Sequence, residues 1–179
     1  MTIFSIYEDS DCQEIQQLFI DTFTDSEGKS EGQVLGKLSR DLIINTDPHD
    51  LYVFVAKEAG QVIGCIFFSR ITLSSSSNAF LLSPVAVNTG YQGRGIGQKL
   101  INHGIQQLKK EGVSLIVTYG DPAFYSKVGF KPISEQLIRP PHKLSQPEGW
   151  LGLRLDGDDI ADMSGDLSCV KAFDNPQLW

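Results

Sequence analysis

Cysteine is scarce in this sequence and forms no grouping. The three cysteines, Cys12, Cys65 and Cys169, lie far apart, and none belongs to a CxxC motif or to a cluster with histidine. An odd and scattered set of cysteines argues against a disulfide framework and against a zinc site. We therefore expect reduced thiols and no bound metal.

Long hydrophobic runs and a cationic N-terminus are also missing. No stretch reaches the roughly 18 uninterrupted apolar residues that a membrane-spanning helix needs. The opening segment, MTIFSIYEDSD, becomes acidic early and lacks the long apolar run of a secretory signal. These absences predict a cytoplasmic protein without a membrane partner.

Positive charge is the third scarcity. The chain has 15 lysine and arginine residues against 22 aspartate and glutamate residues, which gives a formal net charge of −7. A surface of that sign repels phosphate backbones, so we expect no nucleic-acid partner. The 179 residues suit one domain with an ample core, and no repeat or shift in composition marks a boundary. We therefore predict a single domain over residues 1–179.

Apolar periodicity predicts the secondary structure, with β-branched and aromatic runs as strands and helical spacing as helices. The predicted strands are residues 3–7, 51–56, 62–68, 79–87, 113–118, 150–155 and 167–173, and the predicted helices are residues 11–24, 33–44, 95–108 and a short one from 122. Ser10 and Gln13 have the spacing of a capping box for the first helix. The polar residues 25–32 predict a loop, and the serines at 74–77 predict a turn. This order predicts a mixed α/β layer with helices on the sheet faces.

The most informative segment joins the predicted strand 79–87 to the helix that follows. Three glycines, Gly93, Gly95 and Gly97, leave the backbone open at the start of that helix. A helix N-terminus presents unpaired N–H groups and the positive end of the helix dipole, and both suit a pyrophosphate. Glycines allow the backbone to approach such a ligand closely, and Arg94 adds one positive charge.

Three interpretations of this segment compete. A dinucleotide-binding GxGxxG motif would need glycine where Gln98 stands, and it would follow a parallel strand, whereas an antiparallel hairpin is predicted here. The glycines could also serve only a tight turn and close helix packing. The third interpretation is the signature Q/R-x-x-G-x-G/A, which residues 92–97 satisfy.

With this signature the sequence resembles the GNAT family of N-acetyltransferases. A second segment, residues 124–130, reads as the Y-x-K-x-G-F motif of that family and lies one predicted strand later. Residues 83–87, 120–125 and 171–173 look most like the YhbS-type subgroup. The resemblance covers residues 2–131, and residues 132–179 are expected to complete the sheet and the acceptor side. It implies a GNAT fold, with a mixed, mostly antiparallel central sheet, helices on both faces and a splayed cofactor cleft.

The resemblance also implies acetyl-CoA as the cosubstrate. Pro84 fits a bulge at which the strand splays, since proline lacks an N–H group. The backbone of Val85 and Val87 is expected to pair with the pantetheine arm, and one of their N–H groups to polarise the thioester carbonyl. The full set of expected cofactor-binding residues is Val85, Ala86, Val87, Gln92, Gly93, Arg94, Gly95, Ile96, Gly97 and Gln98.

Tyr125 is the catalytic residue that the resemblance implies. A departing thiolate needs a proton, and a phenol can supply it. The alternative is a buried aromatic ring that packs a helix against the sheet. Asp121, directly before Pro122, is expected to cap a short helix.

The general base stays unassigned. Many family members carry a glutamate on the strand before the loop, but residues 79–87 contain no carboxylate. The open candidates are Asp25, Glu27, His142 and a water held by Ser83.

These expectations give one main function and two alternatives. The main one is transfer of an acetyl group to the primary amine of a small molecule or peptide, by direct attack in a ternary complex, in a monomer or homodimer. The first alternative is a catalytically degenerate acyl-CoA-binding sensor or partner module, which the missing strand carboxylate supports. The second is a dinucleotide-binding protein.

Charge is divided unevenly along the chain. Residues 91–110 hold Arg94, Lys99, Lys109 and Lys110 and no acidic residue. Acidic residues concentrate instead at 21–31 and at 156–166. This division suits an anionic cofactor at one place and a cationic acceptor at another.

Overall fold

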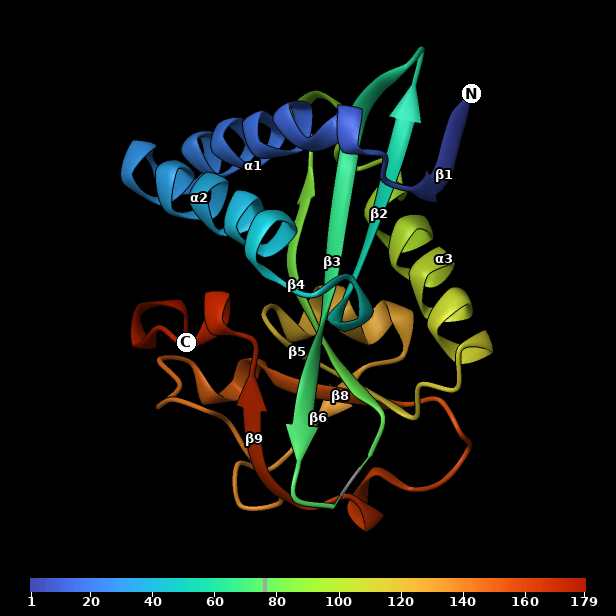
Figure 1. The fold of residues 1–179 in the computed structure, drawn as a ribbon, viewed down its shortest axis with the longest axis vertical. Helices are drawn as coiled ribbons and strands as arrows, with labels where there is room; N and C mark the ends of the chain where they lie inside the picture. Colours follow the sequence, from blue (N-terminus) through green and yellow to red (C-terminus); the bar gives the residue numbers. More distant parts are fainter. Residues whose placement is uncertain (76) are drawn as a thin grey trace. The chain divides into compact units, whose positions relative to one another are not determined.

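The computed structural model describes residues 1–75 and 77–179 (Figure 1). The chain divides into two compact units, the first formed by Met1–Phe67 and Pro84–Gly104 and the second by Phe68–Ser83 and Ile105–Trp179. The prediction that residues 1–179 form one domain remains a prediction. Of the serine turn predicted at 74–77, Ser76 lies outside the described residues.

The helices and strands alternate much as the periodicity predicts. The α-helices are α1 (Cys12–Glu27), α2 (Lys29–Asn45), α3 (Ile96–Lys110) and α4 (Pro122–Tyr125). The strands are β1 (Thr2–Ile6), β2 (Leu51–Glu58), β3 (Gln61–Leu73), β4 (Ala79–Val87), β5 (Leu115–Tyr119), β6 (Lys131–Pro132), β7 (Ile138–Arg139), β8 (Trp150–Arg154) and β9 (Gly165–Cys169). Within the part of the chain that the structure describes, none of the helices combines the length and the apolarity needed to cross a membrane.

The sheet of the first unit is built around a hairpin. Its strands follow the order β1-β2-β3-β4, with β1 antiparallel to β2 from Thr2↔Glu58 to Ile6↔Phe54. The two residues between β2 and β3, Ala59 and Gly60, both have positive φ, at 50° and 80°. Positive φ at both positions is typical of the type I′ turn that joins antiparallel strands tightly. The predicted hairpin is therefore confirmed.

Helices cover both faces of this first sheet. The ring of Phe67 on β3 lies against that of Phe19 on α1, with centroids 5.7 Å apart. A Cβ atom added to Gly64 of β3 would lie 3.5 Å from the side chain of Leu100 on α3. Positions 64 and 67 are an odd number of residues apart, so they face opposite sides of the strand. Consequently α1 and α3 pack on opposite faces.

The predicted loop over residues 25–32 is wrong. Helix α1 continues to Glu27, and Gly28, with φ of 99°, is the one residue before α2 begins at Lys29. Figure 1 shows the two helices side by side. A Cβ atom on Gly32 would lie 2.0 Å from the Thr24 hydroxyl oxygen, and one on Gly36 would lie 2.3 Å from Ile20. The glycines that suggested a loop instead allow two helices to approach closely.

The start of α1 also differs from the prediction. A 3-10 turn, Asp9–Asp11, leads into α1, and its capping box uses Glu8 and Asp11 rather than Ser10 and Gln13, with the Glu8 N–H donating to Asp11 Oδ2 at 2.9 Å. Asp11 is buried and pairs with the ammonium group of Lys57 at 2.7 Å. Lys57 lies far from Asp11 in the sequence. The local spacing of Ser10 and Gln13 therefore could not indicate that Asp11, held by this ion pair, would form the capping box.

The second unit adds the parallel pair of the mixed sheet. In this unit β4 is parallel to β5, from Ala79↔Leu115 to Leu82↔Thr118, and β5 is antiparallel to β8. Strand β9 is antiparallel to the end of β3, from Ile71↔Cys169 to Leu73↔Leu167. The last predicted strand, 167–173, ends early, because Lys171–Phe173 forms a 3-10 turn. The short strands β6 and β7 were not predicted.

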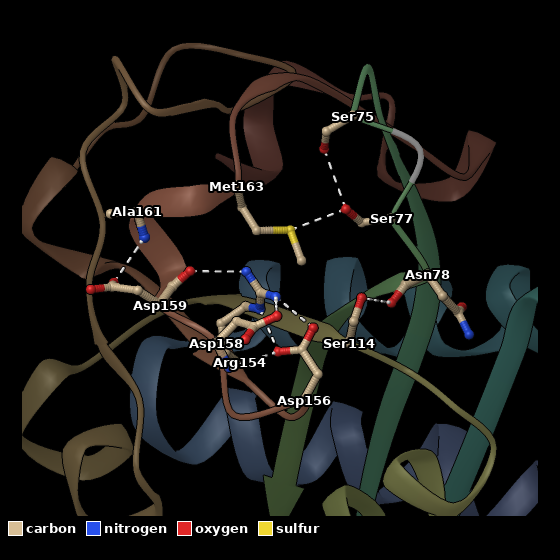
Figure 2. Close-up of polar contacts among 10 residues, drawn as sticks. All are labelled: Ser75, Ser77, Asn78, Ser114, Arg154, Asp156, Asp158, Asp159, Ala161 and Met163. Atoms are coloured by element: carbon tan, nitrogen blue, oxygen red, sulfur yellow. Dashed lines mark hydrogen bonds and ion pairs between the residues drawn. The ribbon is translucent and has the colours of Figure 1, made fainter.

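An arginine organises the acidic segment after β8 (Figure 2). Arg154 Nε donates to Asp156 Oδ1 at 2.8 Å, and Arg154 Nη1 donates to the carbonyl of Asp159 at 2.9 Å. Nearby, the Ser77 hydroxyl contacts Met163 Sδ at 3.1 Å. The carboxylates of this segment thus serve its own conformation.

Candidate functional site

The end of β4 directs half of its backbone groups away from β3. The N–H of Asn88 donates to the carbonyl of Ile63 at 2.8 Å, and the carbonyl of Ala86 lies on the same side, beside Gly64. Backbone polar groups of successive strand residues point to alternate edges. The N–H and C=O groups of Val85 and Val87 therefore point to the edge opposite β3.

The ladder between β4 and β5 ends just before this segment. Its last pair is Leu82↔Thr118, two positions before Pro84. The fully buried Thr118 hydroxyl donates to the Leu82 carbonyl at 2.8 Å and closes the ladder. This position suits the place at which Pro84 was expected to release the strand.

The start of α3 offers a run of free amides. The N–H of Lys99 donates to the Gly95 carbonyl at 3.1 Å, which is the first hydrogen bond of the helix. The amides of Ile96, Gly97 and Gln98 precede it and have no acceptor inside the helix. They begin a helix of 15 residues, whose aligned peptide dipoles place a partial positive charge at this end. This geometry suits an anionic group.

Two of the three glycines are required by backbone conformation. Gly93 and Gly95 have φ of 75° and 74°, a region that residues with a side chain rarely adopt. Nothing lies within 4 Å of a Cβ atom built on either residue, so the requirement is conformational rather than steric. Gly97, in contrast, is buried in the first turn of α3.

Side chains of the loop brace its own backbone. Asn88 Oδ1 accepts from the Gly90 N–H at 2.9 Å, and Gln92 Nε2 donates to the Val87 carbonyl at 2.9 Å. Arg94 Nη2 donates to the Gly90 carbonyl at 3.0 Å, and its guanidinium lies 5.0 Å from the centroid of the Tyr91 ring. Gln92 and Arg94 thus shape the loop, while the exposed Arg94 keeps its positive charge available.

All ten predicted cofactor-binding residues lie together in the first unit. They run from the end of β4 through the loop into α3, and Thr89 links this segment to α1 through a 2.7 Å hydrogen bond from its hydroxyl to Asp25 Oδ2. Sequence reasoning did not single out Lys99 or Phe4. With Arg94 and Ile96 they line a hollow of about 320 Å³, completed by Met1, Thr2 and Glu58. The acid-free segment 91–110 was the signal that included Lys99.

Tyr125 lies in the second unit, at the end of α4. Asp121 caps this helix as predicted, with its Oδ1 accepting from the Ala123 N–H at 2.9 Å. The Tyr125 ring packs over Gly120, where an added Cβ atom would lie 2.7 Å from the ring, and its centroid is 5.8 Å from that of Phe130. Tyr125 is therefore firmly held, although part of its side chain is exposed.

Burial strengthens the protonated form of Tyr125. Desolvation raises the pKa of the phenol to about 12, against an opposing hydrogen bond with Thr118 and with a further rise from the Asp121 carboxylate. A group that ionises near pH 12 stays neutral at physiological pH. Tyr125 is thus a hydrogen-bond donor under all ordinary conditions.

Two of the candidates for the general base are engaged by other side chains. The Asp25 carboxylate accepts from Thr89, and His142 Nε2 lies 2.8 Å from the Asp174 carboxylate. Glu27 is exposed in the last turn of α1, and Ser83 is partly buried at the end of the β5 ladder. The base remains unassigned.

The thiols do not have the character of nucleophiles. Burial raises the pKa of Cys65 well above its usual value. Desolvation, with the Asp174 carboxylate, raises the pKa of Cys169 to about 11. Since the thiolate is the reactive form, both side chains are protonated and unreactive as nucleophiles near neutral pH.

Comparison with known proteins agrees with this geometry. Residues 49–132 match the acetyltransferase (GNAT) domain, a span that contains Tyr125 and all ten predicted cofactor-binding residues. YhbS of Escherichia coli strain K12, named an uncharacterized N-acetyltransferase, is 34% identical over 83 residues, which are 46% of this chain and 50% of that protein. The chain therefore matches about half the length of the curated relatives.

Solved structures extend the likeness over nearly the whole chain. The structure of YhbS from Escherichia coli in complex with CoA has a TM-score of 0.84 at 26% identity, covering 97% of this chain and 92% of that one. A GNAT family acetyltransferase from Brucella melitensis in complex with acetyl-CoA has a TM-score of 0.72 at 28% identity, covering 97% and 99%. Residues 49–132 are therefore similar to a GNAT acetyltransferase domain, and the fold of the chain is that of the GNAT family.

Proposed function

We propose that this protein is an acetyl-CoA-dependent N-acetyltransferase that acetylates a primary amine of a small molecule or peptide by direct attack in a ternary complex. One observation carries the proposal. The first unit presents the outward edge of Val85 and Val87 and, a few residues later, the free amides of residues 96–98. The similar proteins named above as complexes with CoA and acetyl-CoA support the choice of ligand.

The cofactor would use both parts of this segment. The amide groups of the pantetheine arm would pair with Val85 and Val87 as a strand does. The pyrophosphate would meet the N–H groups of residues 93–98 at the positive end of the α3 dipole, with Arg94 beside it. Of the other expected cofactor residues, Gln92 would act by bracing the Val87 carbonyl. The backbone of Ala86 faces β3, so Ala86 would act only by holding Val85 and Val87 in the strand.

The reaction would proceed through a tetrahedral intermediate. The neutral amine attacks the thioester carbon, the C–N bond forms, and an N–H group of Val85 or Val87 donates to the oxyanion. The C–S bond then breaks, and the thiolate takes the phenolic proton of Tyr125. Because the pKa of Tyr125 is about 12, its phenolate regains a proton from solvent at once. The proton lost by the amine passes to water or to the unassigned base.

A second candidate function is an acyl-CoA-binding sensor or partner module without turnover. The observation that favours it is the absence of a carboxylate from β4, together with the engagement of Asp25 and His142 by other side chains. Both functions predict acetyl-CoA binding, so only turnover separates them.

Two measurements test the proposal. Calorimetric titration of the whole chain with acetyl-CoA should show binding at submillimolar ligand, and absence of binding contradicts both candidate functions. Free CoA should then be released with at least one of a polyamine, an aminoglycoside and a peptide with a free amino terminus. Binding without release for all three would favour the sensor. A monomeric or homodimeric state, a cytoplasmic location and the lack of a nucleic-acid partner remain predictions.

A further inference from the structure

The last turn of α1 carries charge of the unfavourable sign. Asp25 and Glu27 lie at its C-terminal end, and that turn contains no basic residue. The C-terminal end of a helix is the negative end of its dipole, so a carboxylate there opposes the helix. A residue that violates a local preference is often held for a purpose elsewhere in the fold.

The structure shows where the Asp25 carboxylate is used. Its Oδ2 accepts a 2.7 Å hydrogen bond from the hydroxyl of Thr89, which lies 64 residues away in sequence and in the same unit. Thr89 opens the 3-10 turn Thr89–Tyr91 directly after β4. This turn leads into the glycine segment, so Thr89 is where the cofactor loop is tied to α1.

The loop beyond Thr89 has little else to order it. Gly93 and Gly95 adopt left-handed backbone conformations with no neighbour near their Cβ positions. The braces from Asn88 and Arg94 are internal to the loop, and that from Gln92 reaches only the Val87 carbonyl at the end of β4. Flexible glycine segments lose much conformational entropy when a ligand orders them. An anchor to a rigid helix reduces that loss.

We infer that Asp25 is a positioning residue for the cofactor loop, acting through the Thr89 hydroxyl. The inference rests on the proposed function in so far as acetyl-CoA is the ligand. It assigns the carboxylate no contact with substrate. Its role is to hold the turn from which the phosphate-binding amides begin.

The chain provides a matched control for charge. Asp21 lies one turn earlier on α1, and its Oδ1 accepts from Gln17 Nε2 at 2.7 Å within the same helix. Asp21→Asn therefore removes the same charge from the same helix without touching the cofactor loop. Thr89→Val removes the hydrogen bond to Asp25 and keeps the carboxylate charge. Thr89→Ser keeps the hydroxyl donor, and Asp25→Asn keeps an oxygen acceptor.

Calorimetry with acetyl-CoA on the whole chain tests the inference. Thr89→Val and Asp25→Ala should each weaken Kd about fivefold, the effect of one lost hydrogen bond to a charged group in partial contact with water. Thr89→Ser, Asp25→Asn and Asp21→Asn should stay within about twofold of the wild-type Kd. The inference is overturned if Thr89→Val leaves Kd unchanged. It is also overturned if Asp21→Asn weakens Kd as much as Thr89→Val does.

Hydrogen exchange of the free protein separates this inference from the proposed function. The amides of Gly90 and Tyr91 both donate to Asn88, at 2.9 Å and 2.8 Å, and report the order of the turn. They should exchange about fivefold faster in Thr89→Val than in the wild type or Thr89→Ser. Equal exchange in all three overturns the inference even if the wild type binds acetyl-CoA. Faster exchange in a protein that does not bind acetyl-CoA supports the tie and rejects the proposed ligand.

Discussion

Two loops of this chain use their polar groups in opposite ways. In the first unit, the segment after β4 leads into α3 with the amides of residues 96–98 unpaired. In the second unit, the segment after β8 satisfies its own groups, as Figure 2 shows. There Arg154 holds Asp156 and Asp158, while Asp159 Oδ1 accepts from the Ala161 N–H at 3.0 Å. The first segment leaves backbone donors free for a ligand, whereas the second uses its polar groups for contacts within itself.

The difference shows that a count of charges is a poor guide to a ligand site. The acidic residues at 156–166 suggested a place for a cationic acceptor, but the Arg154 guanidinium occupies the middle of this segment and its side chain is only 10% exposed. Free donors at the start of a helix, preceded by two glycines of positive φ, form a more specific arrangement for an anion. The loop after β4, with less charge, is therefore the better candidate.

The largest effect on activity is expected from replacing Tyr125, which lies in the second unit with the segment after β8. Tyr125→Phe should lower kcat about 100-fold, because the thiolate loses its proton donor. The shape of the pH–rate profile between pH 6 and 10 should be unchanged, since the pKa of Tyr125 is about 12. Release of CoA across this pH range gives both quantities.

Arg154→Met in the same unit is the control for that measurement and should leave kcat within about twofold. A normal kcat in Tyr125→Phe would make Tyr125 a packing residue. Loss of an alkaline limb below pH 10 would contradict the high pKa.

A glycine pair tests the comparison directly. Gly95 and Gly157 both have positive φ, at 74° and 86°, and both have open space at the Cβ position. Alanine at either site brings a similar backbone strain, on the order of 1–2 kcal/mol. Only Gly95→Ala should weaken acetyl-CoA binding, by about tenfold, as measured by calorimetry. Equal Kd values in the two variants would contradict the assignment of acetyl-CoA binding to the loop after β4 rather than to the segment after β8.

The smallest effect on ligand binding is expected from Arg154→Met. It should leave the acetyl-CoA Kd unchanged but reduce the free energy of unfolding by about 1–3 kcal/mol, because Asp156 and the Asp159 carbonyl lose a charged donor. Urea denaturation of the two proteins at pH 7 measures this loss.

The same pair of proteins has an expected pH dependence. The hydrogen bond from Arg154 is the main cause of the lowered pKa of Asp156. Its stabilising contribution is therefore present above the ordinary carboxyl pKa and lost as the pH falls below about 4. The difference in stability between wild type and Arg154→Met should narrow over that range. A constant difference down to pH 2 would mean that the ion pair is not its source.

Sequence patterns predicted the strands and the short-range geometry well. The bounds of β4 agree with the prediction, and Asp121 caps α4 as expected. Both features are local, since they depend on a run of apolar residues or on a cap two residues from its partner. The glycine signature likewise marked the loop because Gly93 and Gly95 need a special backbone conformation.

Long-range features could not be read in this way. The polar residues 25–32 suggested a loop because glycine and charge are common there, yet Gly32 lies against Thr24 within a helix pair. The bond between Thr89 and Asp25 joins positions 64 residues apart, and nothing in the sequence near either residue indicates its partner. Tertiary packing decides these contacts.

The single-residue junction at Gly28 limits how this part of the chain can change. Each added residue turns a helix by about 100°. Because α1 and α2 have no slack between them, an insertion at Gly28 would rotate α2 and direct Leu35, Leu38 and Leu42, now buried, away from the core. We therefore expect homologous chains to keep the length of this junction and to vary its side chains. Loop-length variation should be found instead at turns such as Ala59 and Gly60, where added residues can extend the tip of the hairpin without rotating a helix.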